Sequence, residues 1–235
     1  MAYSLGWLAP ILRQAGLTVI EEPNWLKAGH GDVTTTKGVI CHHTAGPRAG
    51  NTPSLNVVVN GRPGLKGPLA QLFLARNGDF HCVAAGLAWH AGVGLWQGIR
   101  TGNSSFVGIE AENTGLSNDL PWPQVQYDAY VQGVAAILGK IKQPAIMCCG
   151  HKEYATPRGR KTDPTFNMNE FRTYVTNLLG HKTVTNAVYV VKAGDTLYGI
   201  AKAYKMKLDE LLDINHLTLA TVIHPGDKLE VVSRA

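Results

Sequence analysis

The sequence has few cysteines, and none are paired at the short spacing typical of a structural zinc site. Four cysteines occur in 235 residues, and two of them, Cys148 and Cys149, are adjacent. Adjacent cysteines make a poor disulfide framework, and a chain of this length does not need one. We therefore expect buried, reduced thiols, and neither a disulfide-stapled fold nor a cysteine-rich zinc module.

Long apolar segments are also missing. No run approaches the roughly 20 residues that span a bilayer. The apolar stretch from Leu5 to Ile20 is interrupted by Pro10, Arg13 and Gln14, and no basic segment precedes it, so it does not have the form of a signal peptide. We therefore expect a soluble chain, made in the cytoplasm and not inserted into a membrane.

Charge of one sign is not concentrated along the chain. The net charge of +5 and the pI of about 9.0 favour anionic partners such as nucleic acid, a membrane surface or an acidic wall polymer. Lysine and arginine do not form runs, which argues against nucleic acid. A chain of 235 residues, 45% of them hydrophobic, can form one large domain or a large and a small one.

Two histidines and an aspartate stand out at distant points of the chain. His42 and His43 end a short apolar run, His151 follows a glycine, and Asp163 lies in a basic, proline-containing loop. Two imidazoles and a carboxylate, with a fourth position left for water, form the ligand set of a catalytic zinc. Successive strand residues point to opposite faces, so only one of His42 and His43 can reach such a metal.

Hydrophobic periodicity and turn residues predict an α/β fold, in which a mixed central sheet is flanked by helices. Expected strands are rich in β-branched and aromatic residues and lie at 37–41, 71–75, 80–83 and 106–111. Asn77-Gly78 is a hairpin signal between the second and third of them. Expected helices lie at 5–15, 51–59, from Pro123 to about 142, and 167–179, the last capped by Asn167. Residues 21–36 are expected to form a loop.

The chain also predicts a division into two domains. A larger domain is expected over residues 1–180, and the polar, non-periodic residues 181–187 are expected to form a linker. Residues 188–235 are expected to form a small domain in the order strand, helix, helix, strand. Thr196 follows Gly194-Asp195 at the expected start of its first helix.

The small domain resembles a LysM domain. The resemblance rests on residues 189–197, Ile200-Ala201, Asn215 and residues 223–229, and it covers nearly all of the unit. It implies binding to polymers that contain N-acetylglucosamine, such as peptidoglycan.

The larger domain resembles the zinc N-acetylmuramoyl-L-alanine amidases related to peptidoglycan recognition proteins. The segments that carry this resemblance follow the family's order and lie at 39–46, 88–92, 107–113, 150–151 and 159–164. The Cys-His-His-Thr-Ala-Gly-Pro segment, which follows Gly-His-Gly-Asp at residues 29–32, is most similar to endolysins of phages that infect actinobacteria.

The resemblance implies roles for individual residues. His42, His151 and Asp163 would bind Zn²⁺, Glu110 would transfer protons, and Lys161 would stabilise the oxyanion. Some relatives have a catalytic tyrosine that this chain lacks, and proton transfer is therefore left to Glu110.

Several neighbouring residues keep two interpretations. Trp89 and His90 are expected to contact the muropeptide, although packing roles are also open to them. Lys161 could instead be a solvated loop residue. Glu112 shares a strand face with Glu110, and it would have no role in the chemistry if it faces solvent near the strand end.

These features predict a zinc enzyme that hydrolyses the amide between N-acetylmuramic acid and L-alanine in peptidoglycan. The LysM domain would hold this enzyme, a monomer, on the wall. The family implies an endolysin made in the host cytoplasm that acts on the wall after release. Two alternatives remain open: a non-catalytic peptidoglycan-binding protein, and a zinc peptidase that cuts within the stem peptide.

Overall fold

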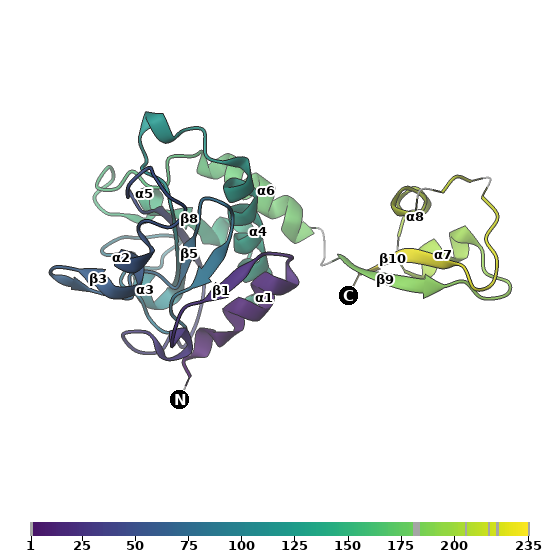
Figure 1. The fold of residues 1–235 in the computed structure, drawn as a ribbon, viewed down its shortest axis with the longest axis horizontal. Helices are drawn as coiled ribbons and strands as arrows, with labels where there is room; N and C mark the ends of the chain where they lie inside the picture. The colour runs from purple at the N-terminus through teal and green to yellow at the C-terminus, as the bar shows by residue number, and fades with distance from the viewer. Residues whose placement is uncertain (1, 181–183, 205, 216, 220, 235) are drawn as a thin grey trace. The chain divides into compact units, whose positions relative to one another are not determined.

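The structure, a computed structural model, describes residues 2–180, 184–204, 206–215, 217–219 and 221–234. The chain divides into two compact units, Met1–Leu179 and Gly180–Ala235 (Figure 1). Each unit has a hydrophobic core of its own.

The larger unit is built on a six-stranded sheet with the strand order β1-β6-β5-β7-β2-β8. Its strands are β1 (Val19–Glu21), β2 (Gly38–His43), β5 (Leu72–Leu74), β6 (Phe80–Cys82), β7 (Phe106–Ala111) and β8 (Cys148–Gly150). β2 runs parallel to both β7 and β8, and β5 runs parallel to β7 but antiparallel to β6. The predicted mixed sheet and the predicted β5–β6 hairpin are therefore confirmed.

Helices flank this sheet, as predicted. They are α1 (Leu8–Gln14), α2 (Leu55–Asn60), α3 (Gly102–Ser105), α4 (Gln124–Lys140), α5 (His151–Tyr154) and α6 (Met168–Gly180). Shorter 3-10 helices are η1 (Ser4–Trp7), η2 (Trp25–Lys27), η3 (Ser117–Asp119) and η4 (Ala145–Met147). The predicted cap of α6 is confirmed, because the backbone N–H of Asn169 donates to Oδ1 of Asn167 at 2.9 Å.

Four short strands were not predicted, and each has only two or three residues. They are β1, β8, and the paired strands β3 (Gly61–Arg62) and β4 (Leu65–Lys66). β8 consists of Cys148, Cys149 and Gly150, so it lacks the β-branched and aromatic residues that mark a strand in a sequence.

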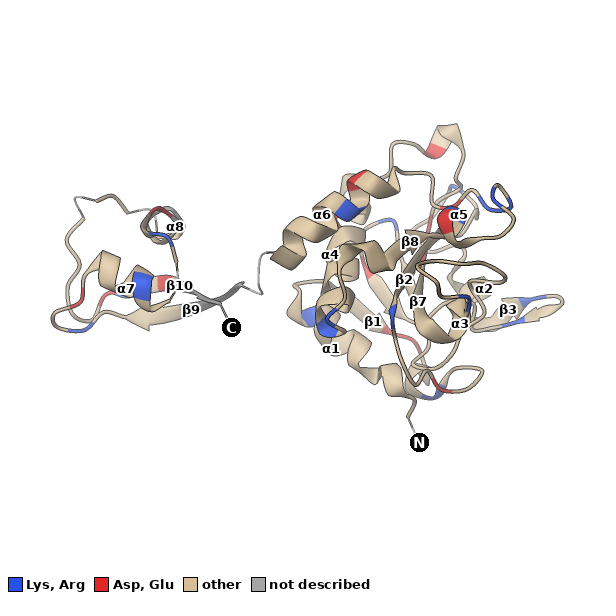
Figure 2. Cartoon of the chain, turned by 180° about the vertical axis from the view of Figure 1, so that it is seen from behind, with Lys and Arg blue, Asp and Glu red and all other residues tan. Residues whose placement is uncertain are grey.

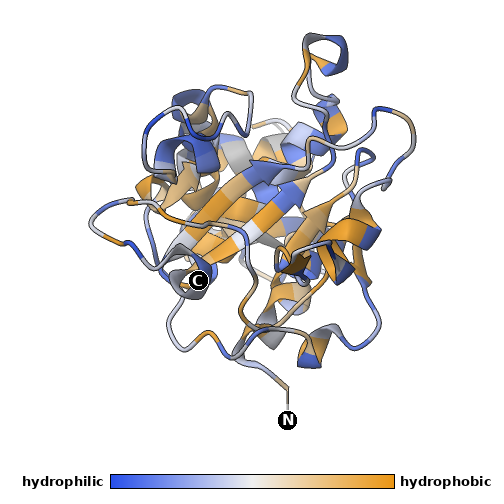
Figure 3. Ribbon diagram, turned by 90° about the vertical axis from the view of Figure 1, so that its left-hand side faces the viewer, coloured by the Kyte–Doolittle hydropathy of each residue, from blue (hydrophilic) through white to orange (hydrophobic). Residues whose placement is uncertain are grey.

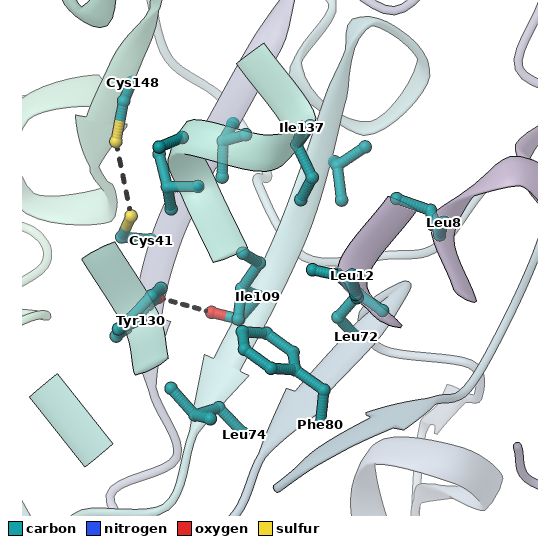
Figure 4. Packing of buried hydrophobic residues seen from close by; sticks show 14 of the residues in the cluster. Leu8, Leu12, Cys41, Leu72, Leu74, Phe80, Ile109, Tyr130, Ile137 and Cys148 are labelled. Atoms are coloured by element: carbon teal, nitrogen blue, oxygen red, sulfur yellow. Dashed lines mark hydrogen bonds between the residues drawn. The ribbon is translucent and has the colours of Figure 1, made fainter. Parts of the chain in front are cut away.

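The main core of the larger unit lies between the sheet and helices that include α1 and α4. Figure 3 shows that apolar residues dominate the strands of the sheet, and alternate residues of β2 and β7 enter this core: Val39, Cys41, Val107 and Ile109. Tyr130 of α4 is fully buried among them. Its hydroxyl donates to the carbonyl oxygen of Ile109 at 2.8 Å (Figure 4). The same hydroxyl accepts from the N–H of His42 at 2.9 Å. One side chain thereby joins β2 to β7.

The smaller unit has the predicted order of strand, helix, helix and strand. β9 (Val184–Val190) pairs antiparallel with β10 (Lys228–Arg234), and α7 (Leu197–Ala203) and α8 (Leu208–Ile214) lie between them in the chain. The hydroxyl oxygen of Thr196 accepts a hydrogen bond from the N–H of Gly199, which confirms the predicted cap of α7. The core of this unit consists of Val191, Ile200, Ala201, Met206, Leu211, Leu229 and Val231.

The linker predicted over residues 181–187 is wrong in its second half. Residues 184–187 belong to β9, where they pair with the last residues of β10. Their polar, non-periodic pattern suggested a loop, but a two-stranded ribbon is held together by its backbone ladder and needs no continuous apolar face. Residues 181–183 lie outside the described residues.

Charged residues are interspersed over the elements of both units (Figure 2). No helix in the described ranges has the length and the apolar character needed to cross a bilayer.

Replacing Tyr130 with phenylalanine should destabilise the larger unit by about 1–3 kcal/mol, because buried backbone groups of His42 and Ile109 would lose a partner. Tyr174→Phe is the control, because Tyr174 is 46% exposed and its replacement should cost less than about 0.5 kcal/mol. All five tryptophans lie in the larger unit, so denaturant unfolding followed by tryptophan fluorescence measures this unit. Equal stabilities of the two variants would contradict the role assigned to Tyr130.

Candidate metal centre

The carboxyl ends of three adjacent parallel strands meet at one edge of the larger sheet. Glu110 lies near the end of β7, His42 near the end of β2, and His151 directly after β8. The strand register places His42 opposite Glu110 and Cys41 opposite Gly150. This edge is also where open α/β sheets place their ligand sites.

Asp163 reaches the same edge from a loop. The chain turns back after α5, and the N–H of Lys152 donates to the backbone carbonyl oxygen of Asp163 at 2.7 Å. This bond holds Asp163 beside His151, although the two residues are 12 positions apart.

The side chains of His42, His151 and Asp163 converge on one point. The Nδ1 atoms of the two histidines and Oδ2 of Asp163 are 3.1 Å apart in each pair, and all three residues are buried. In a tetrahedral site with bonds of about 2.0–2.1 Å, ligand atoms lie roughly 3.3 Å apart. The observed spacing therefore fits one ion with three protein ligands and a fourth position for water. Within the described part of the chain, it is the one group of histidine, cysteine or acidic side chains with such spacing.

The electrostatics of these residues also suit a cation. Burial lowers the pKa of His42 to about 4, so at neutral pH its ring is uncharged and can offer a lone pair. A carboxyl group is ionised at neutral pH unless its pKa is strongly raised. The Asp163 carboxylate is buried, and its Oδ2 lies 3.1 Å from Nδ1 of both histidines, so a divalent metal at this point would neutralise it.

The structure separates the two adjacent histidines of β2. His42 points to the metal centre, whereas the ring of His43 lies near Trp122, with ring centroids 6.3 Å apart. The Nδ1 of His43 is buried and has no hydrogen-bond partner among the described residues. His43 is therefore a packing residue, as the alternation of side chains along a strand requires of one of the two.

Glu110 lies beside His42, with 3.9 Å between its Oε1 and Nδ1 of His42. Its Oε2 is buried and has no hydrogen-bond partner in the part of the chain that the structure describes. Burial raises the pKa of Glu110 to about 8, and the charge of Asp163 adds to that rise. A carboxyl group with a pKa near neutrality can both accept and return a proton.

Lys161 is exposed on the loop that carries Asp163. Burial and Asp163 raise the pKa of Glu110, and the charge of Lys161 opposes them. The ammonium group therefore acts on the centre electrostatically while its side chain remains accessible to a substrate.

Glu112 does not face solvent at the end of its strand. Glu112 is fully buried, and its carboxylate accepts hydrogen bonds from the hydroxyl of Thr44 and from both the N–H and the hydroxyl of Ser54. Gly46 permits this packing, because a Cβ there would collide with Oγ of Ser54. Glu112 thus anchors the loop that follows β2.

His90 and Trp89, both predicted to contact substrate, have different environments. His90 is buried, and its Nδ1 and Nε2 lie 3.1 Å from Nε2 of His42 and 3.2 Å from the carbonyl oxygen of Phe106. Both ring nitrogens are therefore engaged behind the metal centre, and neither is left for a muropeptide. Trp89 is 41% exposed and stacks on His30 with ring centroids 4.8 Å apart. Its contact with substrate stays a prediction.

Comparisons with known proteins bear on this centre. Residues 32–166 match the family described as N-acetylmuramoyl-L-alanine amidase, and this match spans more than half of the chain. The chain belongs to the N-acetylmuramoyl-L-alanine amidase family. Residues 189–232 match the LysM domain. Every residue of the metal centre lies within the amidase match.

Curated relatives in this amidase comparison include two proteins named 1,6-anhydro-N-acetylmuramyl-L-alanine amidase AmpD. The protein of Enterobacter cloacae is 32% identical over 89 residues, which are 38% of this chain and 46% of the relative. The protein of Citrobacter freundii is 33% identical over 98 residues, which are 42% of this chain and 50% of the relative. The chain thus spans about half the length of the curated relatives it matches.

Solved structures share the fold of the larger unit. The crystal structure of a selenomethionine derivative of AmpD has a TM-score of 0.54 at 25% identity, and the match covers 75% of this chain and 100% of that one. The catalytic domain of XlyA has a TM-score of 0.50 at 16% identity, with coverage of 68% and 99%, and it supports the fold alone.

Asp163→Asn should abolish most zinc binding, because the nearly isosteric amide removes the negative charge from the ligand set. We expect the zinc affinity to fall by more than about 100-fold, as measured by competition with a chromogenic chelator. Asp128→Asn is the control, since Asp128 lies on α4 and accepts a hydrogen bond from the exposed Gln124 side chain. An Asp163→Asn variant that binds zinc like the wild type would rule out the predicted ligand set.

Proposed function

We propose that the protein is a zinc-dependent N-acetylmuramoyl-L-alanine amidase, which hydrolyses the amide between N-acetylmuramic acid and L-alanine in peptidoglycan. The observation that carries this proposal is the convergence of His42, His151 and Asp163 beside the unpartnered carboxyl oxygen of Glu110, within the residues that match the family. When bound there, Zn²⁺ would activate a water and polarise the scissile carbonyl.

Side chains of the protein would transfer the proton and stabilise the negative charge that develops on the carbonyl oxygen. Glu110 would accept the proton of the attacking water at Oε2 and return it to the leaving amine. Burial raises the pKa of Glu110 to about 8 in the metal-free chain, so a minority of the carboxyl groups are ionised at neutral pH and both protonation states are populated. Lys161 would bring its positive charge toward the carbonyl oxygen as that atom becomes negative, a contribution of roughly 3 kcal/mol for one such group.

The replacement Glu110→Gln should leave zinc affinity unchanged and reduce turnover by about 10²–10⁴-fold, because the amide cannot carry the proton. Glu170→Gln, at an exposed position of α6, is the control and should keep full activity. Mass spectrometry of products from a defined muropeptide should show a free L-alanine amine and an intact sugar.

Other products would point to other functions. A cut within the stem peptide would favour a zinc peptidase, and binding without any cleavage would favour a recognition protein. Full activity of the Glu110→Gln variant would remove Glu110 from the mechanism.

We propose that the smaller unit binds the N-acetylglucosamine-containing glycan and holds the enzyme on the wall as a monomer. The match of residues 189–232 to LysM supports this proposal. The curated relatives are named for an anhydro-muropeptide, but a glycan-binding unit favours the polymeric wall as substrate. We further propose a bacteriolytic role of the endolysin type, in which the protein is made in the host cytoplasm and acts on the wall after release.

Deleting residues 181–235 should affect activity on insoluble peptidoglycan but not activity on a soluble muropeptide. The larger unit keeps its own core, so its activity on a soluble muropeptide should not change. Its activity on insoluble peptidoglycan should fall by at least about 10-fold, because tethering raises the local enzyme concentration. An equal loss on both substrates, measured as initial rates, would contradict the tethering role.

A further inference from the structure

His90 and Ala91 contact both imidazoles of the metal centre, each at the Nε2 atom and not at the Nδ1 atom that faces the centre. We propose that His90 and the backbone of Ala91 form a bracket that fixes the tautomer and orientation of both histidine ligands, so that His90 is a positioning residue for metal binding. This inference rests on the proposed zinc-dependent function. In this proposal His90 orients His42 through a hydrogen bond and does not contact the muropeptide.

The tautomer of His42 follows from a chain of two hydrogen bonds. Nε2 of His90 lies 3.2 Å from the carbonyl oxygen of Phe106, which can only accept, so Nε2 carries the proton of a neutral His90 ring. Nδ1 of His90 is then an acceptor, and Nε2 of His42, 3.1 Å away, must donate to it. In a neutral His42 ring this leaves the lone pair on Nδ1, the atom that faces the metal centre.

The tautomer of His151 follows from one contact with the next residue. Nε2 of His151 lies 3.0 Å from the carbonyl oxygen of Ala91, which again can only accept. Nε2 of His151 therefore donates, and the neutral ring presents the lone pair of Nδ1. Two successive residues, one through its side chain and one through its backbone, thus impose the same tautomer on both ligands.

With these tautomers, three acceptor atoms face one another. Nδ1 of His42, Nδ1 of His151 and Oδ2 of Asp163 lie 3.1 Å apart, and no proton remains to bridge them. Buried acceptors without a donor are unfavourable, and a cation is the partner that satisfies all three. The bracket therefore prepares the centre for a metal before the metal arrives.

The bracket is itself held in place from two sides. Oδ1 of Asn103 accepts hydrogen bonds from the N–H of His90 at 2.9 Å and from the N–H of Ala91 at 2.7 Å. Gly108 of β7 leaves room for the His90 ring, because a Cβ at that position would collide with it. The ring is consequently fixed against the sheet that carries His42 and Glu110.

A matched pair of replacements tests the bracket in the full chain. His90→Leu and His90→Asn both replace the ring with four non-hydrogen side-chain atoms branched at Cγ, but only asparagine keeps an acceptor near the place of Nδ1. Outer partners of metal-bound histidines typically contribute 10–100-fold in metal affinity. We expect His90→Leu to lose about that much zinc affinity in a chelator competition, and His90→Asn to recover most of it. Unchanged affinity in His90→Leu, or an equal loss in both variants, would overturn the proposal.

A second measurement needs no variant. Nitrogen-15 NMR of the histidine rings in the metal-free wild-type protein should show protonated Nε2 and unprotonated Nδ1 for both His42 and His151. A proton on Nδ1 of either ring would overturn the proposal, whether or not the variants fold.

Different results would contradict the proposed function and the role of His90. A wild-type protein that binds no zinc would overturn the proposed function together with this role. A wild-type protein that binds zinc, with His90→Leu unchanged, would overturn the bracket alone.

Discussion

Three acceptor atoms held 3.1 Å apart in a buried place are the constraint on which the rest of the larger unit depends. Such atoms repel one another without a cation, so the surrounding structure must keep them together. Backbone pairing among β7, β2 and β8 fixes the positions of His42 and of the strand that precedes His151. The hydroxyl of Tyr130 also binds the N–H of His42. The backbone bond from Lys152 fixes the third, Asp163. The centre thus depends on the sheet for its two histidines and on a loop tied to α5 for Asp163.

The parts of this arrangement differ in how far a sequence can predict them. β2 and β7 were predictable because they are continuous apolar segments with β-branched residues, and this placed His42 and Glu110 near strand ends. Nothing in the local pattern places His151 beside them, because β8 has three residues of weak strand character. Residue type suggested that His151 and Asp163 share a ligand set with His42, and the resemblance to a family supported that grouping. The bracket at His90 lies in an irregular segment, where no periodicity fixes a side chain's direction. The rule that metal-bound histidines need a partner on the other nitrogen could have pointed to it.

The environment of Glu112 and the conformation of residues 184–187 were hard to predict for the same physical reason. Alternation along a strand indicates that Glu112 and Glu110 share a face, but it does not indicate that the loop after β2 supplies donors from Thr44 and Ser54. Likewise, the polarity of residues 184–187 describes their side chains, whereas their conformation is set by backbone pairing with β10. In both cases a partner distant in sequence decides the structure, and a local pattern contains no information about that partner.

Glu110, Glu112 and Asp163 have different hydrogen-bond partners, and these partners determine the role of each carboxyl group. Glu112 receives three hydrogen bonds from neutral groups, so its charge is satisfied and it serves as an anchor. Asp163 faces the Nδ1 atoms of two imidazoles and has the position of an anionic ligand. Glu110 keeps one buried oxygen without a donor among the described residues, so burial dominates and raises its pKa to about 8. Different environments thus give these carboxyl groups different roles. The same edge of the sheet can therefore hold a metal with one carboxylate and move a proton with another.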